Sequence, residues 1–364
     1  MNTIKPLDHI AVAKPYVPGG KLHGATGPLA MLASNENPFG PSPLVIEAIR
    51  KAAGEGLQVY PDPDYGALRA AIASAKGIAD ASRVVTSAGS DEIIHILTLC
   101  YAGPGDEVLF TEHAFSMYEV SARVHGAAAI KAPETDMTAG VNAILGAVSP
   151  RTKILFLANP NNPTGTMLSL DALRALQDAL PPHVLFVVDG AYSEYLGTQY
   201  EADLRDLVDR RDTTVMMRTF SKIYGLAALR LGWAYMPKAI ADTFQRIRGP
   251  FNVNTLAVEA GIASVGDEAF LRLSREHNTE WRDILTAGLT ALGLHTPASH
   301  ANFVVAEFGS AERAAAALQH LKDNAILVRA IAGYGLPTKL RITVGSADDN
   351  QRCLDALKAF TSSR

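Results

Sequence analysis

The stretch Arg218–Trp233, RTFSKIYGLAALRLGW, brings two hydroxyl groups, an amine and a guanidinium close together along the chain. It follows a short apolar run, VMM, that is typical of a buried strand. Thr219 and Ser221 precede Lys222, and Arg230 lies eight residues beyond the lysine. These groups can hold a phosphate beside a nucleophilic amine. A lone Lys or Arg is also commonly a solvated surface charge, so the rest of the chain has to decide between the two interpretations.

The bulk composition narrows the class of protein. A chain of 364 residues is long enough for about two domains. Its 48% hydrophobic and 19% charged residues are typical of a soluble globular protein. The net charge of -4, from 33 basic and 37 acidic residues, gives no basic excess for binding nucleic acid. No apolar run approaches the ~18 residues of a membrane span, so we expect no membrane partner.

The N-terminus and the cysteines indicate the compartment. The first residues have no apolar core of signal-peptide length, and prolines interrupt them. Cys100 and Cys353 lie far apart, with no metal-ligand or CxxC spacing, and we expect both to be free, buried thiols. We therefore predict a cytoplasmic protein with no metal site.

Short apolar runs alternate with helical segments through much of the chain. This alternation predicts a parallel sheet buried on both faces, with helices covering it. Ligands bind beyond the carboxyl ends of the strands in such sheets. Polar residues follow three of the apolar runs, at Asn159–Gly165, Asp189–Tyr192 and Thr219–Lys222. We expect these three segments to meet at one edge of the sheet.

A further strand, at Val84 and Val85, leads through a glycine into an amphipathic helix. We expect Ser90 to be the N-cap of this helix, with Asp91 in its first turn. Backbone amides at a helix N-terminus that follows a glycine form an anion site. The alternative is that Ser90 only caps the helix.

The chain also divides into regions that differ in composition and in their pattern of apolar residues. Prolines and paired glycines in residues 1–30 favour an extended N-terminal arm over regular structure. Residues 31–264 carry the alternating pattern and form the expected large domain, whose first stretch could pack with the small domain. A long helical stretch then leads into a strand, helix, strand, strand and helix, which predicts a smaller α+β domain over residues 265–364.

Several motifs, in this order, resemble those of histidinol-phosphate aminotransferases, which belong to the aspartate-aminotransferase superfamily. They are SNENPFGPSP, YPDPDY, SAGSDE, NPNNPTG, TFSKIYGLAALRLG, AILVR and LRITVG, and they span nearly the whole chain. The resemblance implies an α/β fold, the fold type I of pyridoxal-phosphate (PLP) enzymes. It comprises a large domain with a mostly parallel sheet covered by helices, a smaller α+β domain and an N-terminal arm.

The resemblance also implies roles around the cofactor ring. Lys222 would bind pyridoxal 5′-phosphate covalently, because only lysine supplies a side-chain primary amine for a Schiff base. Asp189 would pair with the pyridine nitrogen. It could instead be a turn acid, although a carboxylate that ends the apolar run VLFVV needs a partner. Tyr192 and Asn162 would donate to the phenolic oxygen of the ring.

The same resemblance assigns the phosphate of the cofactor to a group of residues near the strand ends. They are the backbone amides of Ser90 and Asp91, the hydroxyls of Thr219 and Ser221, and Arg230. Phe115 would stack on the ring where many relatives have tyrosine. Tyr60 would reach the phosphate in the neighbouring subunit of a homodimer, or else be a packed loop tyrosine.

The resemblance also implies which residues contact the substrate. Arg329 and Arg341 lie on adjacent predicted strands and would bind the acidic end of the substrate, although either could be a surface charge. Tyr16 and Asn35 are further candidates. Guanidinium groups serve both the phosphate of histidinol phosphate and the carboxylates of glutamate.

Several functions remain open on the sequence. The first is transfer of the amino group between glutamate and imidazole-acetol phosphate in histidine biosynthesis. The second is the same reaction on phenylalanine or tyrosine, and the third is decarboxylation of a phosphorylated amino acid such as threonine phosphate. A PLP-binding transcription regulator needs a DNA-binding module, for which residues 1–30 leave no room. A relative without catalysis is disfavoured because Lys222, Asp189, Tyr192 and Arg230 are all present.

Overall fold

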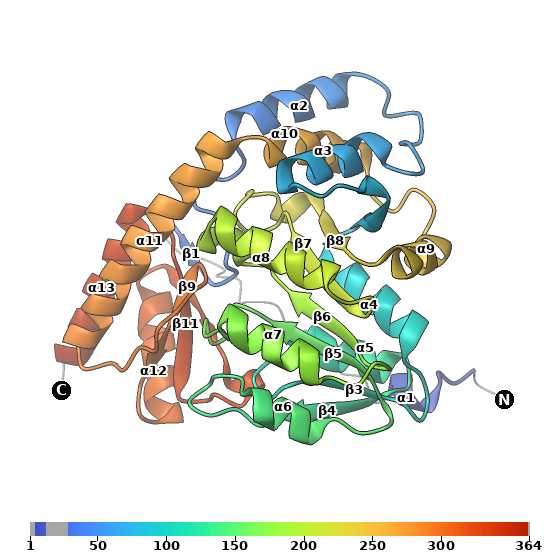
Figure 1. Ribbon diagram of the computed structural model, residues 1–364. Helices are drawn as coiled ribbons and strands as arrows, with labels where there is room; N and C mark the ends of the chain where they lie inside the picture. Colours follow the sequence, from blue (N-terminus) through green and yellow to red (C-terminus); the bar gives the residue numbers. More distant parts are fainter. Residues whose placement is uncertain (1–3, 12–27, 363–364) are drawn as a thin grey trace.

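The computed structural model describes residues 4–11 and 28–362, and its strands form two sheets (Figure 1). The larger sheet has seven strands in the order β2-β8-β7-β6-β5-β3-β4. All its neighbouring pairs from β7 to β4 are parallel, and β8 runs antiparallel to both β7 and β2. The strands are β2 (Val84–Ser87), β3 (Glu107–Thr111), β4 (Ala128–Ala132), β5 (Thr152–Ala158), β6 (Leu185–Asp189), β7 (Thr214–Thr219) and β8 (Gly232–Tyr235).

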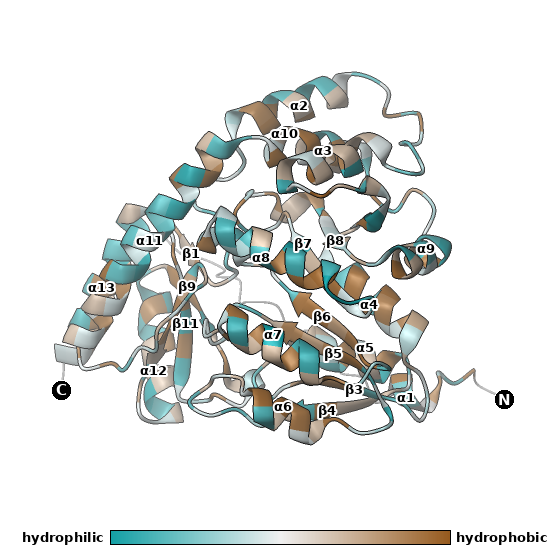
Figure 2. Ribbon diagram, viewed as in Figure 1, coloured by the Kyte–Doolittle hydropathy of each residue, from teal (hydrophilic) through white to brown (hydrophobic). Residues whose placement is uncertain are grey.

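The central strands of this sheet are buried on both faces, as the apolar runs predicted. In β5, Leu155 and Leu157 belong to one hydrophobic cluster, whereas Ile154 and Phe156 belong to another on the opposite face. Successive side chains of a strand point to opposite faces, so each strand fills two cores. Figure 2 shows the result, with apolar strands inside and polar residues on the outer sides of the helices.

Helices cover both faces of the seven-stranded sheet (Figure 1). Those that contribute to the cluster with Ile154 are α4 (Ser90–Tyr101), α5 (Met117–Val124) and α9 (Lys238–Ile247). Those that contribute to the cluster with Leu155 are α2 (Pro43–Gly54), α3 (Gly66–Lys76), α6 (Val141–Ala147), α7 (Leu170–Ala179), α8 (Thr198–Asp209), α10 (Thr255–Val265) and, through Leu271, α11 (Glu268–Ala291).

The smaller sheet has the order β1-β10-β11-β9 and its own hydrophobic core. β1 pairs in parallel with β10, so residues directly after the expected arm join this sheet. The strands are β1 (Ala30–Leu32), β9 (Phe303–Glu307), β10 (Ile326–Ala330) and β11 (Lys339–Thr343), and the helices are α11 (Glu268–Ala291), α12 (Ala311–Asp323) and α13 (Ala347–Ser362). α11 begins beside α10 and runs along α13, joining the two parts of the molecule (Figure 1). The exact domain boundaries stay a prediction.

Several expectations about local structure were wrong. Residues 8–11 form one helical turn, α1 (Asp8–Ala11), where we expected no regular structure, and β1 already begins at Ala30. β8 overlaps the end of the stretch Arg218–Trp233 and was missed, because its four residues GWAY are too few to show the alternation typical of a strand. β4 was missed because its residues are small, half-exposed and interrupted by Lys131. Cys353 is buried but Cys100 is only half-buried, and both are free thiols.

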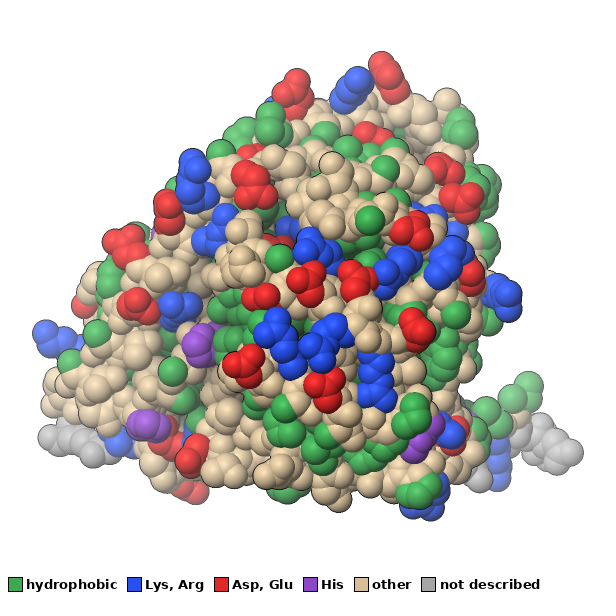
Figure 3. All heavy atoms as spheres, in the orientation of Figure 1, with side chains coloured by type: hydrophobic (Ala, Val, Ile, Leu, Met, Phe, Trp, Pro, Cys, Tyr) green, Lys and Arg blue, Asp and Glu red, His purple; other side chains and the backbone are tan. Residues whose placement is uncertain are grey.

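Short 3-10 helices complete the described part of the chain. They are η1 (Ala81–Arg83), η2 (Ser193–Leu196), η3 (Ala227–Leu229) and η4 (Ala332–Tyr334). Within the described ranges, no helix combines the length and the apolar character needed to cross a membrane. On the face drawn in Figure 3, basic and acidic side chains are interspersed. Exposed ion pairs such as Arg210 with Asp178, 2.9 Å apart, contribute little to stability.

Candidate active site

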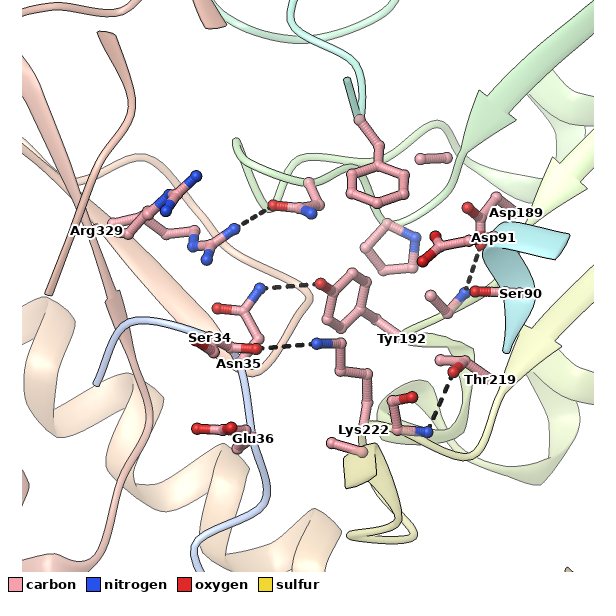
Figure 4. A pocket seen from close by; sticks show the side chains of 18 of the residues that line it. Ser34, Asn35, Glu36, Ser90, Asp91, Asp189, Tyr192, Thr219, Lys222 and Arg329 are labelled. Carbon is pink, nitrogen blue, oxygen red and sulfur yellow. Dashed lines mark hydrogen bonds between the residues drawn. The ribbon is translucent and has the colours of Figure 1, made fainter. Parts of the chain in front are cut away.

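A pocket of about 240 Å³ lies beyond the carboxyl ends of β5, β6 and β7 (Figure 4). Asn162 follows β5, Asp189 ends β6, and Thr219 ends β7 just before Lys222. The smaller sheet contributes Arg329 and Arg341 to the same pocket. The three polar segments that follow separate strands in the sequence therefore meet, as the parallel topology predicted.

Lys222 stands in the middle of this pocket. Its Nζ donates a hydrogen bond to the backbone oxygen of Ser34, 2.9 Å away. Although part of its side chain faces the open pocket, burial lowers its pKa to about 8, and the positive charge of Arg341 acts in the same direction. The carboxylate of Glu36 opposes this shift. An amine with a pKa near 8 is neutral in a useful fraction of molecules and can act as a nucleophile or base.

Asp189 is a buried acid at the floor of the pocket. Its Oδ2 accepts a hydrogen bond of 2.6 Å from the Tyr118 hydroxyl, and its Oδ1 accepts one of 3.1 Å from the amide of Ala191. Burial raises its pKa to about 6, while the bond from Tyr118 opposes the shift. No Lys, Arg or His in the described ranges forms an ion pair with this carboxylate within 4.0 Å. A buried carboxylate in this state provides a site for a cationic group.

Two glycines keep the N-terminus of α4 open. Gly89 precedes the helix with φ of +87°, and a Cβ there would come within 2.4 Å of Arg230 Nη2. A Cβ on Gly232 would lie 2.5 Å from the amide nitrogen of Ser90. Ser90 is the first helical residue and not the N-cap that we expected, since Gly89 occupies that position. The first amides of a helix have no intrahelical acceptor, so this end suits an anion.

Hydroxyl and guanidinium groups adjoin these amides. The Arg230 Nη1 donates to the Ser221 hydroxyl at 3.2 Å, and Arg230 lies 3.6 Å from a carboxylate oxygen of Asp91. The Thr219 hydroxyl accepts a bond from the Ser221 amide at 3.1 Å. All four side chains line the pocket. The structure thus brings together the residues that we expected to hold a phosphate.

Tyr192 connects the ring site to the smaller sheet. Its hydroxyl accepts a hydrogen bond from Asn35 Nδ2 at 2.9 Å, and burial raises its pKa to about 12. Asn35 has a positive φ of 56°. Its backbone N–H donates a hydrogen bond to the Thr343 hydroxyl at 3.0 Å and holds this residue in place. Tyr192 and Asn35, expected on the cofactor and substrate sides, are thus direct neighbours.

The two arginines of the smaller sheet face each other across neighbouring strands. Arg329 on β10 is the cross-strand partner of Arg341 on β11. Arg341 is buried and donates to the backbone oxygen of Ala33 at 2.7 Å and to Asn162 Oδ1. Asn162 therefore uses its oxygen toward Arg341, which leaves its amide nitrogen as the donor toward the pocket.

Two predicted residues lie elsewhere. Tyr60 is 77% exposed and stacks on Phe251 with the ring centroids 4.5 Å apart, outside the pocket of its own chain. Tyr16 lies outside the described residues. Phe115 does line the pocket, with its ring edge-to-face to Tyr118 at 5.9 Å.

Sequence reasoning missed other residues of the site. Tyr118 lies in the first turn of α5, three residues after Phe115, and donates to Asp189 from below the pocket. Glu36 and Ser34 flank Asn35 in the motif SNENPFGPSP. Tyr334, on η4, had no signal because its position depends on how the two sheets meet.

The residues present fit pyridoxal phosphate. This group needs a primary amine, an acid beside its ring nitrogen and an anion cradle, and the pocket offers Lys222, the buried Asp189 and the glycine-lined end of α4. No group of three or more His, Cys, Asp or Glu side chains within residues 4–11 and 28–362 is arranged to hold a metal ion.

Known proteins have sequences similar to this one. The family model of class I and II aminotransferases matches residues 28–357. The chain is 80% identical over 364 residues to the histidinol-phosphate aminotransferase of Hyphomonas neptunium. The match covers 100% of this chain and 99% of the relative. It is 46% identical over 360 residues to that of Dinoroseobacter shibae, with 99% of each chain covered.

Solved structures share the fold. The histidinol-phosphate aminotransferase from Sinorhizobium meliloti, in complex with pyridoxal-5′-phosphate, superposes with a TM-score of 0.86 at 28% identity, covering 92% of this chain and 91% of the other. Aspartate aminotransferase from Thermus thermophilus with maleate gives a TM-score of 0.83 at 21% identity, covering 98% and 100%, and shows the fold alone. The expected fold type I, with its mostly parallel sheet, is confirmed.

Proposed function

This chain belongs to the class I and II aminotransferases, and we propose that it interconverts histidinol phosphate and 2-oxoglutarate with imidazole-acetol phosphate and glutamate in L-histidine biosynthesis. The observation that carries the proposal is a pocket in which Lys222, Asp189 and the open end of α4 face Arg329 and Arg341. The full-length similarity to histidinol-phosphate aminotransferases supports the choice of substrate.

Pyridoxal phosphate, when bound, supplies an electron sink that stabilises negative charge on the substrate carbon. Lys222 would hold it covalently, and Asp189 would keep a proton on its ring nitrogen. The Tyr192 hydroxyl accepts from Asn35, so its own proton is available for the ring oxygen, beside the amide of Asn162. Phe115 would cover the face of the ring.

The cofactor phosphate would lie at the start of α4. The amides of Ser90 and Asp91, the hydroxyls of Thr219 and Ser221, and the Arg230 guanidinium would bind it. Charge-assisted hydrogen bonds from a guanidinium are roughly twice as strong as neutral ones. The ion pair of Arg230 with Asp91 orients the guanidinium toward this position.

Lys222 would also move the proton during the reaction. Its Nζ would take the proton from the substrate carbon that carries the amino group. It would then give that proton to the cofactor side, which completes transfer of the amino group. A base works best when its pKa lies near the working pH, and a pKa of about 8 meets this condition. The bond from Nζ to the backbone oxygen of Ser34 keeps the amine directed across the pocket.

Arg329 and Arg341 would bind the acidic end of either substrate. A guanidinium binds phosphate and carboxylate with the same planar pair of donors, so one pocket can accept histidinol phosphate and glutamate in turn. Arg341 is already fixed by Ala33 and Asn162, which limits the ordering that substrate binding requires. Asn35 would adjoin the substrate, and Tyr16 is a further proposed contact.

The proposed active unit is a homodimer in the cytoplasm. Tyr60 is exposed beside other apolar side chains, Leu57 and Val59, and would be buried by a second subunit, whose cofactor phosphate it would reach. The free thiols of Cys100 and Cys353 suit a reducing compartment.

The proposal is tested by comparing kcat/KM for histidinol phosphate and for phenylalanine, each with 2-oxoglutarate. Because the site would hydrogen-bond groups that phenylalanine lacks, we expect histidinol phosphate to be favoured at least ~10²-fold. A larger kcat/KM for phenylalanine would identify an aromatic aminotransferase instead. Release of carbon dioxide from threonine phosphate without formation of a keto acid would identify a decarboxylase.

A further inference from the structure

Glu36 is a pocket residue whose backbone is fixed on both sides. Before it, Asn35 is tied to Thr343 and Tyr192. After it, Asn37 Nδ2 donates to the backbone oxygen of Ile223 at 2.6 Å and to the Ser274 hydroxyl at 3.0 Å. Both asparagines are buried, whereas Glu36 is exposed to the pocket. Such anchoring presents one side chain to the pocket at little cost in ordering.

Figure 4 shows where this carboxylate lies relative to the two sides of the pocket. Glu36, Asn35 and Arg329 lie on one side of Lys222 in this view, and the residues around the cofactor site, such as Asp189 and Ser90, lie on the other. Glu36 is therefore on the side where the proposed substrate would extend.

The other two acids of the pocket, Asp91 and Asp189, already have a structural or a proposed role. Asp91 is paired with Arg230, and Asp189 accepts bonds from Tyr118 and Ala191 beside the proposed ring nitrogen. In the described part of the chain, no cation lies within 4.0 Å of the Glu36 carboxylate to form an ion pair. The substrate side of the pocket thus contains two guanidinium groups and a single carboxylate.

Histidinol phosphate has two ends that match these two kinds of group. Its phosphate suits the arginines, and its imidazole ring carries an N–H donor and becomes a cation near pH 6.5. We propose that Glu36 is a specificity-determining residue that accepts a hydrogen bond from the imidazole ring of the substrate. The inference rests on the proposed function. Glutamate and phenylalanine have no ring N–H, so neither can make this contact.

The test is the variant Glu36→Gln, assayed with histidinol phosphate and, in the reverse direction, with glutamate. Glutamine keeps an acceptor oxygen but not the negative charge. A hydrogen bond to a charged group is roughly twice as strong as a neutral one, so kcat/KM for histidinol phosphate should fall by about 10-fold. We expect kcat/KM for glutamate to change by less than about threefold, since a missing contact costs only the substrate that makes it. The ratio of phenylalanine to histidinol phosphate turnover should rise in parallel.

Glu47→Gln is the matched control, because Glu47 is an exposed glutamate on α2 outside the pocket. An equal loss for both substrates would overturn the proposal and would indicate that Glu36 acts only through its charge on Lys222. No loss for either substrate would overturn it as well. Failure of the wild-type enzyme to use histidinol phosphate would instead overturn the proposed function, and the inference with it.

Discussion

Lys76 and Lys222, two largely enclosed lysines in the described part of the chain, have pKa values that are shifted in opposite directions. Burial opposes the charge of Lys76, but the Tyr224 hydroxyl and the carboxylates of Glu201 and Glu194 raise its pKa above the usual value. The Nζ of Lys76 lies 2.6 Å from Glu201. Lys222 has no such partner, and burial with Arg341 lowers its pKa to about 8. A lysine in an ion pair with a carboxylate is structural, whereas one whose pKa is lowered by burial and a nearby guanidinium is reactive.

The two regions are neighbours in the fold. Arg218, on the strand that ends before Lys222, is buried with Glu194 and Glu201, at 3.3 and 3.9 Å. These residues and Lys76 form a buried ion cluster on one side of β7. The cluster packs beside the strand that positions Lys222, so paired charges support the strand that leads to this lysine.

The largest expected effect is that of Lys222→Ala on turnover. We expect a loss of at least ~10⁴-fold, because the variant removes both the covalent anchor and the base. Stability of the cofactor-free protein should not fall, since a buried charge without a partner is removed. Lys76→Met is the matched control and should have the opposite profile, with lower stability and retained turnover. Single-turnover kinetics and urea unfolding measure the two quantities, and equal loss of turnover in both variants would remove the distinction.

Arg218→Met should have the next largest effect, on stability. Breaking a buried pair leaves Glu194 buried without its partner, which costs about 3–5 kcal/mol of unfolding free energy. Arg174→Ala serves as control, because Arg174 is half-exposed and its ion pairs are partly solvated, and it should cost at most ~1 kcal/mol. Urea unfolding of the cofactor-free proteins measures both. Similar values for the two variants would show that the cluster does not support the fold.

Asp189→Asn should stabilise the cofactor-free protein while weakening cofactor binding. The carboxyl pKa is raised to about 6, so its charge destabilises the folded state above pH 6. About two pKa units correspond to ~3 kcal/mol, and a mismatched hydrogen bond offsets about 1 kcal/mol of this, which leaves a gain of ~1–2 kcal/mol at pH 7.5. The gain should shrink as the pH falls through 6 and vanish near the usual pKa of 3.8. Thermal unfolding between pH 4 and 8 measures it, and a gain that grows at low pH would have the wrong sign.

Tyr118→Phe should have the smallest effect of this series. The Tyr118 hydroxyl donates to Asp189 and holds the pKa of that carboxyl below the value that burial alone would set. Its removal should cost about 1 kcal/mol at pH 7.5 and less at pH 4, where Asp189 is protonated. The same unfolding series checks this. A cost that does not depend on pH would mean that the bond does not tune Asp189.

Some of this site was predictable from the sequence, for definite physical reasons. Parallel strands share one carboxyl edge, so polar residues after β5, β6 and β7 had to meet, and Lys222 with Asp189 followed from that rule. Glu36 was missed although it stands inside the motif SNENPFGPSP, because no period distinguishes a pocket residue from a surface one. Tyr118 was missed because its bond to Asp189 depends on how α5 packs against β6. The ion cluster of Arg218 was missed for a different reason. Its members come from α3, η2, α8 and β7, and only the packing of these elements brings them together.

Lys222, and not Lys76, is the lysine that we expect to carry the cofactor. The most direct test is to incubate the purified protein with pyridoxal phosphate, reduce it with borohydride and locate the modified lysine by mass spectrometry of its peptides. We expect a pyridoxyl group on Lys222 and none on Lys76, which forms an ion pair with Glu201. Stoichiometric label on any other lysine, or label that persists in Lys222→Ala, would contradict it.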